Sequence, residues 1–219
     1  MNYRTYSLVL AYARLGALSL LLTIATVGLS CSSASAALSV EEYGKNILNR
    51  RMAILTDSSL SVPERRAAIR ELLRSSFDVR RMALFALGGA AATASPQEVA
   101  AYLKSFEDLT IETYVSMVEG YGGQTARITG SKERAPGDYL IFAEFSDSSA
   151  SGGRKLSLVM FRVLANGEKF SVVDANVEGA WFGLAQRDSV QGFLATKGAS
   201  ISKLIEHINR LADQAPKVN

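Results

Sequence analysis

The sequence is poor in the residues that most enzymes use for metal binding and nucleophilic catalysis. Its 219 residues include one cysteine and one histidine, which is too few for a typical zinc site. A Ser-His-Asp triad would depend on His207, which lies in a charged terminal segment and is better explained as a solvated surface side chain. The G-x-S-x-G, Walker and dinucleotide-binding patterns are also missing. We therefore predict that the protein is not an enzyme and holds no metal and no cofactor.

The beginning of the chain reads as an export segment. Met1 to Ala36 combines two arginines with an uncharged apolar run from Leu15 to Leu29, and it ends in a small-residue A-x-A pattern. This is typical of a cleaved secretory signal peptide. We predict residues 1–36 to be the signal peptide and residues 37–219 to be a single domain. That domain would have no disulfide and would depend on its core alone, which fits a bacterial periplasm.

Two details of this segment bear on whether the protein is lipid-anchored and on whether it binds nucleic acid. Cys31 leaves open a lipoprotein, but Gly28 stands where a lipid-attachment site has a leucine-like residue, so the cleaved form is favoured. Arg4 and Arg14 leave with the signal peptide while all 21 acidic residues follow Ala36, so the exported domain is nearly neutral. A nearly neutral domain is a poor partner for nucleic acid.

The first half of the exported domain is predicted to be helical, because apolar residues recur there at helical spacing behind recognisable caps. The predicted helices are Ser39–Leu55, a second one that begins after Ser61, Phe77–Leu87 with Asp78 as its cap, and Pro96–Gly120 with Ser95 and Glu98 as a capping box. The second helix carries Arg65, Arg66, Arg70 and Arg74 away from its apolar face. This is a solvated face or a docking surface for an acidic partner or lipid headgroups.

The second half changes to the period of a β-sheet. The predicted strands are Thr125–Ser131, Asp138–Ser146, Lys155–Ala165 and Glu168–Val177, with Asn166-Gly167 as the turn between the last two. After the last strand the chain breaks at Glu178-Gly179, exposes Trp181 and Phe182, and returns as a helix over about Ala185–Thr196 that ends at Gly198. A further helix closes the chain. The fold class is therefore α+β, an antiparallel meander of about four strands covered by about six helices.

The third and fourth predicted strands are apolar on both faces, which leaves two interpretations. Helices cover the sheet on both sides, or the sheet curls around an internal apolar pocket. Asp174 interrupts the fourth strand and offers an enzyme alternative, an isomerase-like proton abstraction by a carboxylate in an enclosed pocket. A third alternative is a non-catalytic interaction protein that docks through the arginines of the second helix.

Three segments together resemble the MlaC / toluene-tolerance (Ttg2-type) family of periplasmic phospholipid-binding carriers. They are Met82–Ile128, with Leu87-Gly88, Pro96-Gln97, Phe106, Tyr114 and Tyr121-Gly122-Gly123; Val172–Phe182, with Asp174 and Glu178-Gly179; and Phe193–Ile208, a helix, a glycine break and a second helix. The resemblance covers about Val40 to Leu211. In one place the sequence departs from the family, because small residues at 89–92 stand where an aromatic residue is common.

The resemblance implies a lipid carrier with an apolar pocket. We expect the walls to come from nine residues: Phe85, Phe106, Met117, Phe142, Val159, Phe161, Val173, Val177 and Trp181. The implied partners are a phospholipid or hopanoid ligand, an inner-membrane ABC transporter complex with its MCE-type subunit, and an outer-membrane lipoprotein–porin complex. The carrier would maintain outer-membrane lipid asymmetry. We expect Trp181→Ala to weaken lipid retention more than it weakens folding.

Overall fold

The computed structural model describes residues 32–119, 125–146, 155–167 and 169–214. The chain divides into two compact units, Met1–Leu38 and Ser39–Asn219, and the fold below is that of the second. Residues 1–31 of the predicted signal peptide, including Cys31, lie outside the described residues. The predicted helix stop at Gly120–Gly123 lies outside them as well. None of the described helices combines the length and the apolar character needed to cross a membrane.

The predicted helices are confirmed, with small changes at their ends. They are α2 (Ser32–Thr56), α3 (Val62–Ser76), α4 (Val79–Leu87), α5 (Pro96–Glu119), α6 (Phe182–Leu194) and α7 (Ile201–Gln214). The 3-10 helix η1 (Gly88–Ala92), which was not predicted, follows α4. The caps explain where the helices start. The Ser61 and Ser95 backbone N–H groups donate to Glu64 and Glu98 at 2.9 and 3.0 Å, and Asp78 accepts a bond from the Arg81 N–H. These bonds satisfy donors that a helix leaves without partners in its first turn.

The sheet has five strands instead of the expected four, in the order β1-β2-β3-β4-β5, and every neighbouring pair is antiparallel. The strands are β1 (Thr125–Ala135), β2 (Asp138–Ser146), β3 (Lys155–Asn166), β4 (Lys169–Val177) and β5 (Ala180–Trp181). The fifth strand forms because Glu178 and Gly179 both take positive φ angles, 52° and 92°. Such a pair makes the tight turn that joins two antiparallel strands.

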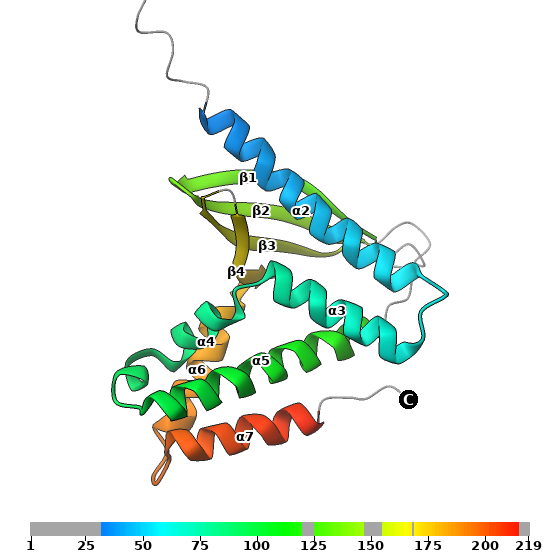
Figure 1. Ribbon diagram of the computed structural model, residues 1–219. Helices are drawn as coiled ribbons and strands as arrows, with labels where there is room; N and C mark the ends of the chain where they lie inside the picture. Colours follow the sequence, from blue (N-terminus) through cyan, green and yellow to red (C-terminus); the bar gives the residue numbers. More distant parts are fainter. Residues whose placement is uncertain (1–31, 120–124, 147–154, 168, 215–219) are drawn as a thin grey trace, which may run out of the picture. The chain divides into compact units, whose positions relative to one another are not determined.

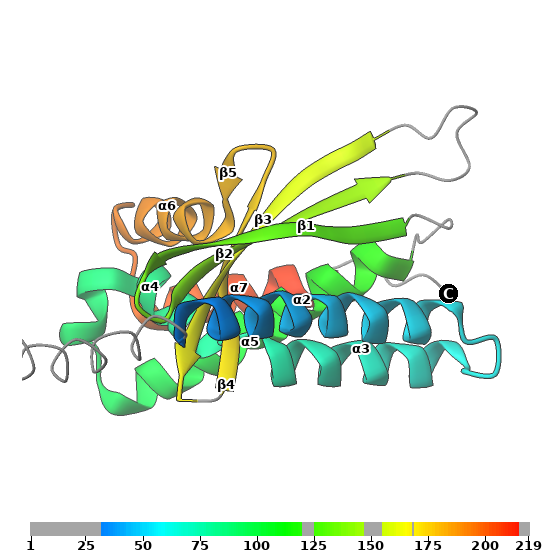
Figure 2. The ribbon, with the colours of Figure 1, turned by 90° about the horizontal axis from the view of Figure 1, so that it is seen from above.

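Helices and sheet enclose three clusters of buried apolar side chains in the described part of the chain. The ribbon shows α2 lying across the sheet, and α3, α5 and α7 lying one below the other beneath α2 and the sheet (Figure 1). Helix α6 lies beside β5 (Figure 2). One cluster joins α2 to the sheet, one joins α2, α3 and α5, and one joins α4, α5, α6 and α7. Phe77, between α3 and α4, packs against all three.

Asp174 of β4 fixes the beginning of α6. Its Oδ1 atom accepts hydrogen bonds from the backbone N–H of Gly183, at 2.9 Å, and of Ala175, at 2.8 Å. The helix therefore starts at Phe182, before the predicted Ala185. Gly183 is needed because a Cβ atom there would lie 3.0 to 3.3 Å from the Asp174 carboxyl group. The carboxylate that was the enzyme alternative thus serves as a cap for a distant helix.

We expect Gly183→Ala to destabilise the protein by about 1 kcal/mol, because it displaces a cap of ordinary strength. Alanine has the higher helix propensity, so the same change should stabilise the protein once Asp174 is replaced by alanine. Equilibrium unfolding of the two single variants and of the double variant measures both effects. The same sign for Gly183→Ala in both backgrounds would contradict this account of the corner.

Candidate functional site: an apolar face of the sheet

Strand register separates the two faces of the sheet. Cα partners in antiparallel strands share a face, and residues two apart along a strand share it as well. One face packs against α2, since Tyr139, Ile141, Val163 and Val172 form a cluster with Val40 of that helix. We call this the helix-facing face. Its residues form four rows across the strands: Tyr139–Val163–Val172; Ile141–Phe161–Ala175; Ile128–Ala143–Val159–Val177; and Ala126–Phe145–Ser157.

The first row is fully buried, whereas the other three rows contain half-buried or exposed side chains, with Ile141, Ala143 and Val159 buried among them. In the first row every side chain is buried. In the second row Phe161 and Ala175 are half-buried. In the third row Val177 is 47% exposed although Val159 beside it is buried, and in the fourth row Ala126 and Phe145 are half-buried. An apolar face that is closed at one end and open at the other is a candidate site for an apolar ligand.

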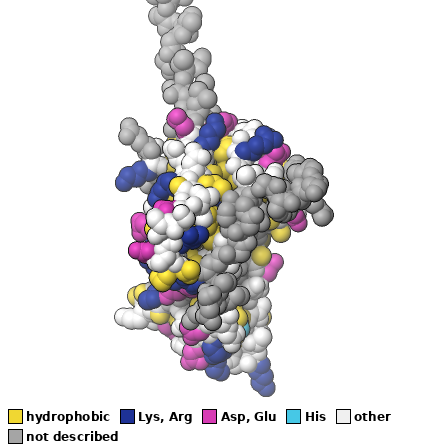
Figure 3. Space-filling model, turned by 90° about the vertical axis from the view of Figure 1, so that its right-hand side faces the viewer, with side chains coloured by type: hydrophobic (Ala, Val, Ile, Leu, Met, Phe, Trp, Pro, Cys, Tyr) yellow, Lys and Arg dark blue, Asp and Glu magenta, His cyan; other side chains and the backbone are white. Residues whose placement is uncertain are grey.

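A polar pair lies over the open end of this face. Arg51 of α2 donates from Nε to the Tyr114 hydroxyl of α5 at 3.1 Å. The guanidinium carbon of Arg51 lies 5.8 Å from the centre of the Phe145 ring, in the fourth row. The sheet, α2 and α5 therefore meet at this point. Figure 3 shows hydrophobic side chains gathered among charged ones in the upper half of the side that faces right in Figure 1.

The structure brings together three of the nine predicted wall residues. Val159, Phe161 and Val177 lie on β3 and β4 on the helix-facing face, within two adjacent rows. The Phe161 ring also meets the Phe77 ring edge-on, at 6.5 Å between centres. These residues are the part of the predicted wall that shares one surface.

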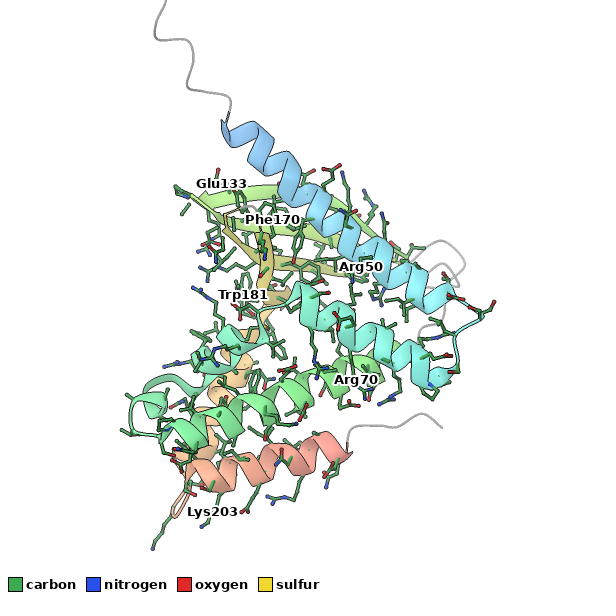
Figure 4. The ribbon with its side chains drawn as sticks, in the orientation of Figure 1. Arg50, Arg70, Glu133, Phe170, Trp181 and Lys203 are labelled. Carbon is green, nitrogen blue, oxygen red and sulfur yellow. The ribbon has the colours of Figure 1, made fainter. Side chains whose placement is uncertain are left out.

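The other predicted residues lie elsewhere. Phe142 and Trp181 belong by register to the opposite face of the sheet, since Phe142 pairs with Met160 and Trp181 with Asn176, and these two partners pair with each other. Figure 4 shows Trp181 where the sheet meets α6. Phe106 is buried in the cluster of α4 to α7, Phe85 is 45% exposed on α4, and Val173 is buried at a register shift in β4. The Met117 side chain lies outside the described side chains.

Sequence reasoning missed Arg51, although the sequence contains a sign of it. Val40, Gly44 and Ile47 of α2 recur at helical spacing and turn toward the sheet. Val40 and Ile47 belong to its cluster, and a Cβ atom added at Gly44 would lie 3.0 Å from Ile141. Arg51 continues the same stripe. An arginine inside an apolar stripe marks a position where function or a polar contact overrides the pattern.

Three of the four arginines of α3 form ion pairs with acidic residues of α5, and of these three Arg74 is exposed. Arg66 and Arg70 both bind the carboxylate of Glu112 on α5, and Arg74 binds Glu107. Arg66, Arg70 and Glu112 also line a polar groove between α3, α5 and α7, together with Asp108, Asn209, Ala212 and Asp213. Its lining is charged and polar, unlike the helix-facing face of the sheet. In the described residues, no group of acidic, histidine and cysteine side chains could hold a metal ion.

The fold is α+β with an open apolar sheet face as its candidate site, and comparison with known proteins adds a family. The model of the MlaC protein family matches residues 45–210, so the chain belongs to that family. A phospholipid-binding protein from Ralstonia solanacearum, solved in complex with a phospholipid, is similar in structure: the TM-score is 0.67 at 18% sequence identity, over 81% of this chain and 98% of that one. No curated protein matches the chain.

Proposed function

We propose that this protein is a periplasmic carrier that binds a phospholipid with its acyl chains against the open rows of the helix-facing face. The observation that carries the proposal is an apolar sheet face that is fully buried in its first row and reaches the surface further along, at the half-exposed Val177 and the half-buried Phe145. Membership of the MlaC family supports it. The structural neighbour from Ralstonia solanacearum, which holds a phospholipid, supports it as well.

The energetics of lipid transfer agree with such a surface. Each methylene group removed from water contributes about 0.8 kcal/mol, so two acyl chains supply ample binding free energy without specific polar contacts. A carrier must also release its lipid, and an open-ended face gives the chains a path in and out. Few strong polar contacts keep dissociation fast enough for a shuttle.

We propose further that the carrier shuttles phospholipid between outer- and inner-membrane components of an Mla-type ABC transport system. Its partners there would be an inner-membrane complex with an MCE-type subunit and an outer-membrane lipoprotein–porin complex. The direction of transfer belongs to those partners, since a carrier with one site binds and releases the same ligand at both membranes. A hopanoid would cover the same apolar rows and is the alternative ligand class.

The proposal is tested on protein purified from the periplasm without added lipid. Native mass spectrometry should show a population heavier by the mass of one or more lipids, and extraction of the same sample should identify their class. Phosphorus in the extracted lipid favours a phospholipid over a hopanoid. Consistently lipid-free protein that also fails to take up lipid from vesicles would refute the carrier function.

A further inference from the structure

We propose that Arg51 and Tyr114 form a binding site for a lipid phosphate group at the open end of the helix-facing face. The inference rests on the proposed function, because it assigns the headgroup end of the same ligand. It starts from two contacts, the hydrogen bond from Arg51 Nε to the Tyr114 hydroxyl and the position of the guanidinium 5.8 Å from the centre of the Phe145 ring. These contacts join the three elements that border the open end.

The pair lies one row beyond the open apolar rows. Rows on one face of a strand repeat every two residues, which is about 7 Å. Acyl chains that cover Phe161 in the second row and Val177 in the third would place the glycerol and its phosphate one row further, at Phe145. Arg51 lies over this ring. A phosphate at this point keeps contact with water while its chains are covered.

The chemistry of the pair fits an anion with several oxygens. A guanidinium carries five N–H donors in a planar fork, and a phenol that accepts one hydrogen bond still carries an O–H donor. A phosphate group can replace the long contact between a terminal nitrogen of Arg51 and the Met52 sulfur, at 3.8 Å, and accept a hydrogen bond from the Tyr114 hydroxyl as well. The cation–π contact with Phe145 restrains the guanidinium, which lowers the entropy that the side chain loses when it binds a phosphate.

Arg51 differs from the neighbouring Arg50 in its half-buried environment. Arg50, the preceding residue, is exposed and donates to the Ser75 hydroxyl of α3 at 3.4 Å (Figure 4). Arg51 is half-buried and points with the apolar stripe of α2 toward the sheet. The two neighbours therefore carry the same charge into different environments, and Arg50 is a matched control.

The test is a competition between two lipids with identical acyl chains. The purified protein is incubated with vesicles that contain dioleoylphosphatidylglycerol and dioleoyl-digalactosyldiacylglycerol in equal amounts, and the lipids recovered with it are quantified by mass spectrometry. We expect the wild type to take the phosphate-bearing lipid about fivefold in excess, the preference that a partly exposed charge-assisted hydrogen bond provides. Arg51→Gln should bring the ratio close to one through a loss of the phosphate-bearing lipid, and Arg50→Gln should leave the ratio as in the wild type.

Two further variants keep the test sharp if Arg51→Gln folds poorly. Arg51→Lys retains the charge and loses the fork, and Tyr114→Phe retains the ring and loses the hydroxyl, so both should give ratios between those of the wild type and one. Inorganic phosphate titrated into lipid-free protein should produce no saturable heat, because it lacks the chains that bind the apolar rows. Saturable binding of phosphate that Arg51→Gln removes would identify free phosphate as the ligand and overturn the headgroup assignment.

The outcomes separate this inference from the function on which it rests. A loaded wild type with a lipid ratio near one overturns the phosphate site and leaves the carrier intact. An equal fall of the ratio in Arg50→Gln and Arg51→Gln also overturns it, since a general surface charge would then be responsible. A wild type that takes up neither lipid refutes the carrier function itself.

Discussion

We expect Val177→Glu to reduce the lipid bound to the purified protein by at least about tenfold, because an acyl chain against this position would have to bury an ionised carboxylate. Val177 is 47% exposed, so a glutamate can remain in water there when no lipid is bound. The free energy of unfolding should therefore fall by no more than about 1 kcal/mol, the range of strand propensities. Lipid extraction with mass spectrometry measures the first effect, and urea denaturation of lipid-free protein measures the second.

The matched control is Val62→Glu. Val62 is 54% exposed, which is close to the exposure of Val177, and it is the first residue of α3, away from the sheet. A glutamate in the first turn of a helix is favourable, so this variant should fold and load lipid as the wild type does. Equal lipid loss in both variants would show that added negative charge, and not the helix-facing face, controls binding.

Trp181 provides a second comparison. The sequence led to the expectation that Trp181→Ala weakens lipid retention more than folding. The register instead places Trp181 on the face of Asn176, opposite to Val177. If the open rows hold the lipid, Trp181→Ala should change lipid retention less than Val177→Glu does. The reverse order would move the lipid to the other face of the sheet.

Local features of the fold could be read from the sequence because neighbouring residues determine them. Ser95 with Glu98 forms the expected capping box. Asn166-Gly167 joins β3 to β4 as predicted, with Gly167 at a φ of 62°. In each case the partners are at most three residues apart, so the physical cause lies within the pattern itself.

The start of α6 and the fifth strand could not be read in the same way. The helix begins at Phe182 because Asp174, nine residues earlier and on another element, accepts the Gly183 N–H. The turn before β5 requires a positive φ at Glu178, and glutamate gives no indication of that conformation. Contacts between elements decide both features, and a local pattern does not contain them.

The sequence predicted the apolar character of the candidate site better than it predicted which residues share one face. Strands β3 and β4 are apolar on both faces, so alternation could not show which apolar residues turn toward the helices. A register shift at Val173 in β4 makes the assignment harder, because one extra residue exchanges the faces. Val159, Phe161 and Val177 were therefore predicted together with Phe142, which lies on the other face. Register, which is a property of strand pairs, was the missing information.

The second large effect is expected from the loss of the Phe77 ring, a side chain that packs against all three apolar clusters of the described residues. Phe77 lies between α3 and α4, its N–H donates to the Leu73 carbonyl at 2.8 Å, and it forms an isolated parallel bridge with Val172 of β4. The next residue, Asp78, donates its N–H to the Val172 carbonyl at 2.9 Å. The backbone thus fastens this point to the sheet, while the ring contacts Phe161 and the helical clusters. Removal of the ring should loosen the sheet from the helices.

We expect Phe77→Ala to lower the free energy of unfolding by about 3 kcal/mol, the lower end for a phenylalanine truncated in a core, because the ring is only partly buried. The denaturation midpoints measured by two spectroscopic probes should also differ in this variant. The chain's single tryptophan, Trp181, reports on the corner between sheet and α6 by fluorescence, and far-ultraviolet circular dichroism reports on the helices. In the wild type both should follow one denaturation transition, and in Phe77→Ala the two midpoints should differ.

Phe85→Ala is the control for this variant. It removes the same ring from α4, where the side chain is 45% exposed and lies under the guanidinium of Arg187 at 5.2 Å. Its cost should stay below about 1 kcal/mol, the usual strength of an exposed cation–π contact. Equal losses in the two variants, or coincident transitions in Phe77→Ala, would show that the sheet and the helices are joined by contacts spread over many residues. The position of the helices over the helix-facing face would then depend on all of these contacts together and not on Phe77.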